Sequence, residues 1–255
     1  MRNHHAYISE IFSSIQGEGV YVGVRQVFVR FAGCNLSCDY CDTPASGFDH
    51  PESCAVQIAP GERRFKELPN PLDVPTTLAA IINIELESPG HHSVSLTGGE
   101  PLMQAPFLAE LCPELRKSDL RAYLESNGTL VDALSDALPH IDIVAMDFKL
   151  ESATGIKPAT EMHREFLAAA VAAGKDVFVK AIVTSSTAEE EIEECAAVIA
   201  LAGRRIPLII QPVTSTNANV QSPFAAQIMR LQVAASRILD DVRVIPQCHK
   251  MLGLI

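Results

Sequence analysis

The amino-acid sequence predicts an α/β fold in which about six or seven mainly parallel strands form an incomplete, TIM-like βα barrel. Segments rich in β-branched and other apolar residues alternate with amphipathic helical patterns, and polar or glycine-rich turns follow the strands. A strand followed by a helix, repeated along the chain, implies a parallel sheet with right-handed crossovers. The expected strands cover residues 24–31, 93–96, 121–126, 141–148, 177–184, 208–213 and 242–245.

Composition limits the class of protein. The chain has 255 residues, 47% of them apolar, so residues 1–255 can bury a full core as one domain. The net charge of −11 argues against a nucleic-acid partner and favours a small substrate. The N-terminus lacks a signal-peptide core, and no stretch approaches the roughly 18 apolar residues of a membrane span. Seven cysteines, three of them crowded together, fit a reducing compartment. We therefore expect a soluble, cytoplasmic protein that does not bind membranes.

The N-terminal part begins with a short expected strand at residues 7–12. Residues 13–19 follow, with Gly17 and Gly19 on either side of Glu18. Such glycines indicate either an ordinary turn or a backbone that approaches something closely. The strong strand at 24–31 then leads into a cysteine-rich loop.

Residues 44–75 are expected to form an irregular insertion with room for one short hairpin or helix. Prolines stand at positions 51, 60, 69, 71 and 75, and the hydrophobic pattern has little periodicity. Asp73 or Thr76 can then cap a helix that runs to about Glu87, because the Ser-Pro-Gly sequence at 88–90 stops it.

Three later helices follow from periodicity and capping. The helix at 161–173 is expected to bury one face, and Gly174 ends it. A helix reaching Gly203 begins with a capping-box pattern, Thr187 three residues before Glu190. The face of the first helix comprises Met162, Phe166, Ala169 and Ala170, and the stripe of the helix at 222–239 comprises Phe224, Ile228, Leu231, Ala235 and Ile238.

Functional groups in such sheets gather at the carboxyl ends of the strands. Polar, glycine or cysteine residues stand at nearly every expected strand end, which indicates one site at that edge. These are the cysteine loop after 24–31, then residues 97–101, 125–128, 147–149, Lys180 and 211–212.

Cys34, Cys38 and Cys41 form a CxxxCxxC pattern on one short loop. Three thiolates favour zinc, copper(I) or an iron–sulfur cluster. A closed zinc site needs four ligands, which His50 or Cys54 could complete. Without a fourth protein ligand, one position stays open for chemistry.

The CxxxCxxC loop, together with Thr97-Gly98-Gly99-Glu100-Pro101, resembles the radical S-adenosylmethionine (SAM) superfamily. The resemblance implies an incomplete barrel of the radical SAM type and a 4Fe–4S cluster held by Cys34, Cys38 and Cys41. For Asn127 alone, a turn at a helix start is an equal alternative. The implied SAM contacts are Tyr40, Cys41, Asp42, Gly99, Glu125, Asn127, Asp147, Phe148, Lys149, Gln211, Pro212, Val213 and Thr214.

Further motifs at residues 15–19, 30, 41–43 and 247–250 resemble the family of 7-carboxy-7-deazaguanine synthases. These are carbon–nitrogen lyases that make a 7-deazapurine precursor of queuosine. The resemblance implies ring contraction of 6-carboxy-5,6,7,8-tetrahydropterin with loss of ammonia, started by removal of hydrogen from C6. It also implies Mg²⁺ bound by Thr43, although a capping or turn role for that residue is equally open.

The same resemblance implies a set of substrate contacts. Arg30 could grip a carboxylate bidentately, whereas an isolated Arg on a strand more often reaches the surface. The last residues form an apolar tail that we expect to dock, bringing the terminal carboxylate of Ile255 to the substrate. The implied substrate contacts are Ile15, Gln16, Gly17, Glu18, Arg30, Thr97, His249 and Ile255.

Two alternatives stay open at this point. A glycyl-radical-enzyme activase would use the same cysteine motif but needs a protein partner, and a zinc-stabilised binding module would have no turnover. For the synthase, the implied partners are an electron donor such as flavodoxin or ferredoxin and a second copy of the chain in a homodimer.

Overall fold

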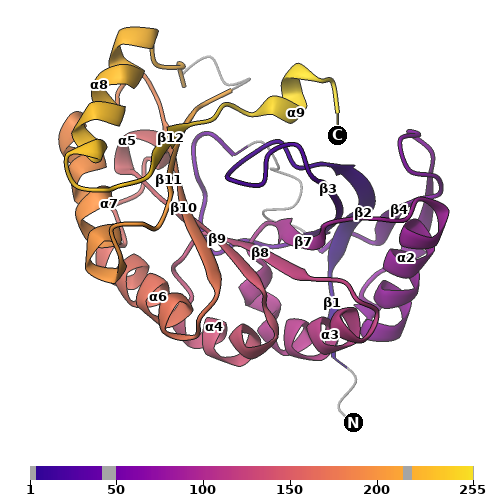
Figure 1. The fold of residues 1–255 in the computed structure, drawn as a ribbon. Helices are drawn as coiled ribbons and strands as arrows, with labels where there is room; N and C mark the ends of the chain where they lie inside the picture. The colour runs from indigo at the N-terminus through magenta and orange to yellow at the C-terminus, as the bar shows by residue number, and fades with distance from the viewer. Residues whose placement is uncertain (1–3, 42–49, 215–219, 255) are drawn as a thin grey trace.

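The computed structural model describes residues 4–41, 50–214 and 220–254. The main sheet has ten strands in the order β12-β11-β10-β9-β8-β7-β3-β2-β4-β5, and it curves into an open barrel (Figure 1). Seven consecutive strands, from β12 to β3, run parallel to one another. Their bounds are β3 Arg25–Phe31, β7 Ser93–Gly98, β8 Ala122–Ser126, β9 Ile143–Phe148, β10 Asp176–Val183, β11 Leu208–Pro212 and β12 Val242–Val244. The predicted fold class is confirmed.

Helices cover the outer, convex side of the sheet (Figure 1). An apolar core fills the space between these helices and the strands. The longer helices are α2 Val74–Glu87, α3 Ala105–Lys117, α4 Val131–Ala137, α6 Thr160–Ala172, α7 Glu189–Ala202 and α8 Ala225–Ser236. The shorter ones are η1 Pro101–Gln104, η2 Leu138–His140, α5 Glu151–Thr154 and α9 Cys248–Met251.

The segment expected to be an irregular insertion contributes strands to the sheet. β4 (Ser53–Gln57) pairs parallel to β2 (Ile8–Ile15), and β5 (Phe65–Pro69) pairs antiparallel to β4. A two-stranded sheet, β1 (His5–Ala6) with β6 (Leu72–Asp73), ties the N-terminus to the end of this segment. The described part of the segment is therefore a hairpin that widens the sheet by its last two strands.

The helix starts show where local patterns succeeded and failed. The Asp73 carboxylate accepts the Thr76 N–H at 2.9 Å, so α2 begins as predicted. The capping box of α7 was placed one residue early, because Glu191 accepts the Ala188 N–H at 3.2 Å. Thr187 instead accepts the Thr184 N–H at 2.9 Å with its hydroxyl.

Two predicted helix faces were partly wrong. In α6, Met162 is 51% exposed, and His163 and Leu167 are buried beside Phe166. In α8, Leu231 and Ala235 are buried as expected. Phe224 is 60% exposed because it lies at the N-cap position, before the helical turn begins.

The loop between β2 and β3 lies inside the curve of the sheet (Figure 1). Its Val20 and Tyr21 pack with Ile245 against a small inner cluster of Tyr123, Ile143, Ala145, Phe178 and Ile209. The loop is therefore more than an ordinary turn, since it fills part of the barrel interior and places residues 16–18 beside the strand ends.

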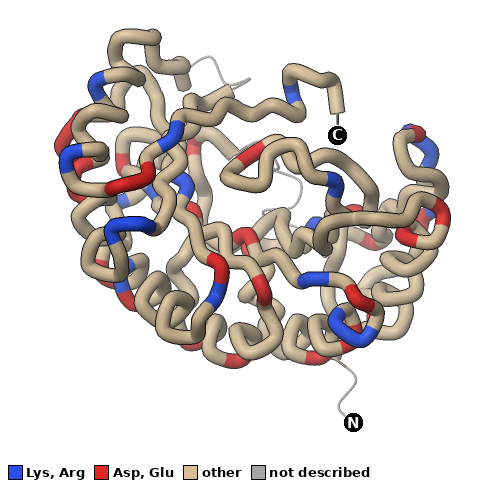
Figure 2. The backbone as a smooth tube through the Cα atoms, in the orientation of Figure 1, with Lys and Arg blue, Asp and Glu red and all other residues tan. Residues whose placement is uncertain are grey.

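Charged groups of both signs are interspersed over the outer helices (Figure 2). Among the described residues, no helix combines the length and the apolar character that crossing a membrane requires.

Candidate active site

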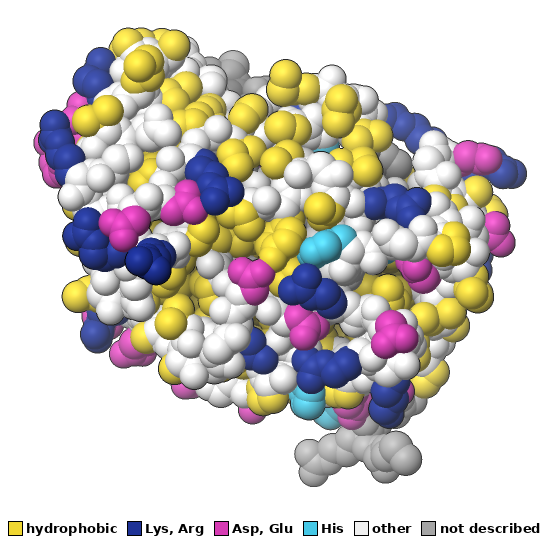
Figure 3. Space-filling view, viewed as in Figure 1, with side chains coloured by type: hydrophobic (Ala, Val, Ile, Leu, Met, Phe, Trp, Pro, Cys, Tyr) yellow, Lys and Arg dark blue, Asp and Glu magenta, His cyan; other side chains and the backbone are white. Residues whose placement is uncertain are grey.

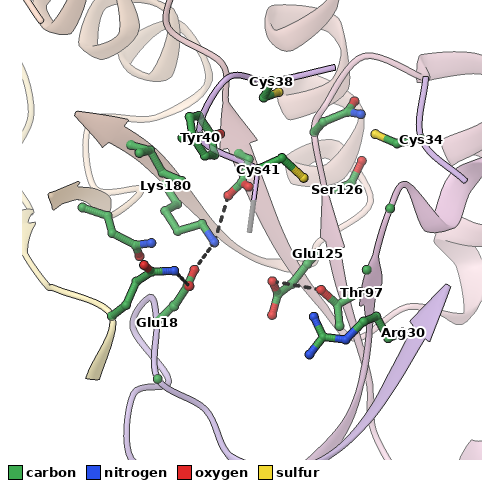
Figure 4. A pocket seen from close by; sticks show the side chains of 18 of the residues that line it. Glu18, Arg30, Cys34, Cys38, Tyr40, Cys41, Thr97, Glu125, Ser126 and Lys180 are labelled. Atoms are coloured by element: carbon green, nitrogen blue, oxygen red, sulfur yellow. Dashed lines mark hydrogen bonds and ion pairs between the residues drawn. The ribbon is translucent and has the colours of Figure 1, made fainter. Parts of the chain in front are cut away.

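A cavity of about 330 Å³ opens at the carboxyl ends of the strands. It gathers residues from both ends of the chain and from strands β2 to β11 (Figure 4). The predicted residues that line it are Ile15, Gln16, Gly17, Glu18, Arg30, Cys34, Cys38, Tyr40, Cys41, Thr97, Gly99, Glu125, Asn127, Asp147, Lys149, Gln211, Val213, Thr214 and His249.

A few predicted residues are not brought into the cavity. Phe148 is buried and packs on His163 with ring centroids 4.4 Å apart, and Pro212, the last residue of β11, is not part of the lining. A side chain in a strand points to one face only, so neighbours of cavity residues face away. Asp42, Thr43 and Ile255 lie outside the described residues.

The three cysteines of the loop lie along one side of the cavity (Figure 4). All three are free thiols, and burial raises the pKa of Cys34 and of Cys38. Within the described ranges, no three His, Cys, Asp or Glu side chains converge as ligands of a single metal ion. Cys54 is fully buried on β4 and is not part of the lining, so the zinc alternative loses this ligand.

Two features of the cavity fit a cluster with bound SAM. Three free thiols on one loop are the donor set of a cluster whose fourth iron is left for a cofactor. The Gln211 side-chain oxygen is buried without a hydrogen-bond partner, although it belongs to a residue of the cavity wall. Buried acceptors are nearly always satisfied, so this oxygen is an acceptor available to a donor group of a bound ligand.

A row of buried charges crosses the cavity. Lys180 pairs with Glu18 and, at 3.2 Å, with Asp147, which also accepts from Lys149 at 3.0 Å. Lys149 then donates to the Tyr40 hydroxyl at 2.9 Å. Burial would raise the carboxyl pKa values, but Lys180 holds that of Glu18, and Lys149 and Lys180 hold that of Asp147, below their usual range. The row links the loop after β2 to the cysteine loop.

Glu125 occupies the neighbouring position at the end of β8. It accepts from the Gln16 amide at 3.0 Å and from the Ser95 and Thr97 hydroxyls at 3.3 Å each. Burial raises its pKa even though Lys180 acts in the opposite direction. Figure 4 shows Glu125, Thr97 and Arg30 on the side of the cavity away from the cysteines.

Arg30 lines the cavity but already has a partner. Its Nε donates to Glu10 at 2.9 Å, and its guanidinium lies 5.5 Å from the centre of the Phe12 ring. Its side chain is 21% exposed, so it does not simply extend into solvent. The remaining guanidinium nitrogens leave donors for a ligand carboxylate.

The C-terminal segment packs on the loop after β2. Gln247 donates to Glu18 at 2.7 Å, and the Cys248 N–H donates to the Gly17 carbonyl at 2.9 Å. The apolar docking expected for the tail is wrong for its described side chains, since Met251 and Leu252 are 77% and 65% exposed. Figure 3 shows hydrophobic side chains exposed along the upper edge of the molecule, where α9 lies in Figure 1. Polar and backbone contacts hold this segment instead.

Comparisons with known proteins decide the family. Residues 28–199 match the family model described as the radical SAM superfamily. The chain belongs to this superfamily. It is 42% identical to a 7-carboxy-7-deazaguanine synthase of Geobacter sulfurreducens over 97% of each chain, and 35% identical to one of Archaeoglobus fulgidus over 98% and 99%. Within the superfamily it is therefore a member of the 7-carboxy-7-deazaguanine synthase family.

A solved structure agrees on the fold. The crystal structure of QueE from Escherichia coli has a TM-score of 0.60 and 19% identity, over 96% of this chain and 95% of that one. The family predicted from the motifs is confirmed, and these relatives favour a synthase over an activase.

In this radical SAM fold, Glu100 acts as a buried anchor. It is fully buried and accepts the backbone N–H groups of Asn127 at 2.7 Å and Leu102 at 3.1 Å. Burial raises its pKa to about 7. Asn127 donates to Asn35 at 2.7 Å, which fixes the start of the cysteine loop to the end of β8.

Sequence reasoning left part of the lining unassigned. The strand-end pattern placed Gly98, Ser126 and Lys180 at this edge of the sheet, and Gln247 belongs to the C-terminal motif, but none of the four was assigned a contact. The other residues carried no separate signal, since they resemble ordinary core or turn positions. The unassigned lining residues are Phe12, Phe28, Leu36, Ser37, Gly98, Ser126, Lys180, Ile182 and Gln247.

Proposed function

We propose that this protein converts 6-carboxy-5,6,7,8-tetrahydropterin to 7-carboxy-7-deazaguanine, with ring contraction and loss of ammonia. The observation that carries the proposal is a single cavity. It is lined by the three cysteines and by most residues for which the family resemblance implies cofactor or substrate contacts. The relatives' printed names support the same reaction.

Cys34, Cys38 and Cys41 would hold the 4Fe–4S cluster, and Gly99 and Gln211 would contact SAM. When bound, these groups supply the radical that removes hydrogen from C6 of the pterin. Gly98 allows the backbone to approach closely here. Its φ is +111°, and a Cβ at this position would lie 2.4 Å from the Phe31 carbonyl oxygen.

The opposite side of the cavity would bind the pterin. Glu18 is ionised and can accept hydrogen bonds from the guanidine-like end of the substrate. Arg30 would grip the substrate carboxylate with the donors that Glu10 leaves free. His249, packed against Gly17, would close the site from the C-terminal side.

Three further parts of the proposal rest on the resemblance. Thr43 would bind Mg²⁺, and its neighbour two residues earlier, Cys41, lines the cavity. Flavodoxin or ferredoxin would donate the electron that reduces the cluster, in the reducing cytoplasm that the free cysteines suit. The protein would act as a homodimer.

The test is anaerobic turnover of the iron–sulfur-reconstituted, reduced protein with SAM, Mg²⁺ and 6-carboxytetrahydropterin. Mass spectrometry should detect 7-carboxy-7-deazaguanine only when all components are present. If SAM were cleaved without this product, the substrate assignment would be wrong. If metal analysis found about one zinc per chain and no acid-labile sulfide, the assignment of a 4Fe–4S cluster would be wrong as well.

A further inference from the structure

Lys180 is a buried cation among the apolar residues of β10. It lies within β10, between Val179 and Ala181, and is 5% exposed. The sheet register places it beside Asp147 of β9, so their side chains share the inner face of the barrel. It lines the cavity although neither motif nor family resemblance assigned it a role.

The Lys180 ammonium serves more than one carboxylate. It pairs with Glu18 from the loop after β2 and with Asp147 at 3.2 Å (Figure 4). Glu125 of β8 also lies close enough to act on it electrostatically. A buried ion pair contributes little to stability compared with apolar packing. Its presence on the cavity wall therefore calls for an explanation other than stability.

Glu18 depends on this contact. It lies outside any strand or helix, and its carboxylate is held by Lys180 and by the Gln247 amide at 2.7 Å. Burial acts to raise the pKa of Glu18, and Lys180 is the main group that lowers it. Without the ammonium, burial would act on Glu18 with less opposition, raising its pKa and favouring the protonated carboxyl group.

We propose that Lys180 is a positioning residue for the substrate: it keeps the Glu18 carboxylate ionised and directed into the cavity, ready to accept from the donor edge of the pterin. The inference rests on the proposed function, which supplies the pterin. Lys180 acts through Glu18 and need not touch the substrate itself.

The test measures binding rather than turnover. The Kd of 6-carboxytetrahydropterin is determined by anaerobic calorimetry on cluster-loaded protein with saturating SAM and no reductant, from pH 6.5 to 9. In Lys180→Gln, binding should be at least about tenfold weaker than wild type at pH 6.5 and should recover toward pH 9 as Glu18 ionises. Lys180→Arg should restore most of the affinity.

Controls isolate the role of Lys180. Asp147, Glu125 and Tyr123 also act on Glu18, and the loss of Lys180 changes the pKa of Asp147 and of Glu125 too. The same pH series in the Glu18→Gln background therefore isolates Glu18: there, Lys180→Gln should no longer change the pH profile of the Kd. Lys66→Gln, an exposed lysine of β5, should bind like wild type at every pH.

A second comparison covers the case in which Lys180→Gln does not fold. The ion pair is absent both from Glu18→Gln and from the double variant Glu18→Gln/Lys180→Gln. If Lys180 acts only through Glu18, these two variants should bind the pterin with equal Kd values. A weaker double variant, or a Lys180→Gln protein with wild-type Kd and pH profile, would overturn the inference. Wild-type protein that neither binds nor converts the pterin would instead overturn the proposed function.

Discussion

At the scale of single residues, the tightest approach in the site is between Gly17 and His249. A Cβ on residue 17 would lie 2.2 Å from His249 Nδ1 and 2.5 Å from its backbone nitrogen. We expect Gly17→Ala to displace the C-terminal segment, because backbone atoms cannot move aside cheaply. The displacement should cost about 1–3 kcal/mol of substrate binding, measured as a higher KM.

The matched control for this substitution is Gly203→Ala. Gly203 has an extended backbone with φ of 165°, and a Cβ there would meet Ile206 at an ordinary 3.5 Å. This variant should keep the wild-type KM. Equal behaviour of the two alanine variants would contradict the close packing of the tail on residue 17.

Thr43 carries the magnesium prediction. If its hydroxyl is a ligand, Thr43→Ala should raise the Mg²⁺ concentration for half-maximal activity by about tenfold. Thr43→Ser keeps the hydroxyl and should behave like wild type. Activity measured against Mg²⁺ concentration checks this, and an unchanged dependence in the alanine variant would remove Thr43 from the site.

His163 makes the stability of the fold depend on pH. It is fully buried, its Nε2 lies 3.0 Å from the Asn127 carbonyl, and burial lowers its pKa from 6.5 to about 4. The unfolded chain therefore takes up this proton first as the pH falls. The stability that the neutral ring contributes is lost progressively between pH 6.5 and 4, amounting to about 2 kcal/mol at pH 5.

His163→Gln keeps a donor for the Asn127 carbonyl but removes the titration. The free energy of unfolding is measured in urea at pH 7 and at pH 5 for both proteins. Its decrease from pH 7 to pH 5 should be about 2 kcal/mol smaller in the variant than in wild type. The difference between the proteins cancels other groups, such as Glu100, whose raised pKa acts with the opposite sign. If the free energy of unfolding fell equally in both proteins between pH 7 and pH 5, the His163 ring would be protonated in the folded state at pH 5, and the argument would be wrong.

At the scale of elements, the β4–β5 hairpin reaches the C-terminal segment. Arg63, in the turn of the hairpin, donates to the Gly253 carbonyl at 3.2 Å, whereas Arg64 pairs with Glu62 of the same turn. Both arginines are exposed, so each contact is worth at most about 1 kcal/mol.

Arg63→Ala should therefore raise the substrate KM about two- to threefold through a less ordered tail, without changing the melting temperature. Arg64→Ala removes the same charge from the same turn and should have no effect on KM. Steady-state kinetics and thermal melts of the two variants check this, and an equal KM in both would exclude a tail contact.

The elements that sequence patterns predicted well are those with local signals. Six of the seven parallel strands, β7 to β12, are each followed by a helix, β3 leads into the cysteine loop, and Asp73 has the spacing of a cap. The hairpin was harder because β4 is short, lies among prolines and pairs with β2, about 40 residues earlier in the chain. Such pairing is decided by tertiary contacts, which leave no local pattern.

The site divides in the same way. Cysteine spacing and strand-end motifs predicted most of the lining, since short motifs stay together in any fold. Lys180 was expected at a strand end but without partners, because Glu18 and Asp147 are brought to it only by the curvature of the sheet and by the loop after β2. The alternation of side chains along β10 predicts which face of the strand Lys180 lies on, but it does not predict which carboxylates lie beside it on that face.

At the scale of the whole molecule, both ends of the chain build the substrate half of the cavity. Residues 16–18 come from the loop after the second strand, and residues 247–249 reach them across the open side of the barrel (Figure 1). The cluster half comes from the loop after β3. Loss of the last residues should consequently affect substrate binding and leave the cofactor half intact.

Removal of residues 252–255 tests this arrangement. The described apolar side chains of this stretch are exposed, so the free energy of unfolding should change by less than about 0.5 kcal/mol. The substrate KM should rise, because the segment that carries His249 loses its last contacts, while the Kd of SAM stays at the wild-type value. An unchanged KM would mean that the tail has no part in binding, and a weaker SAM Kd would mean that the two halves of the cavity are not independent.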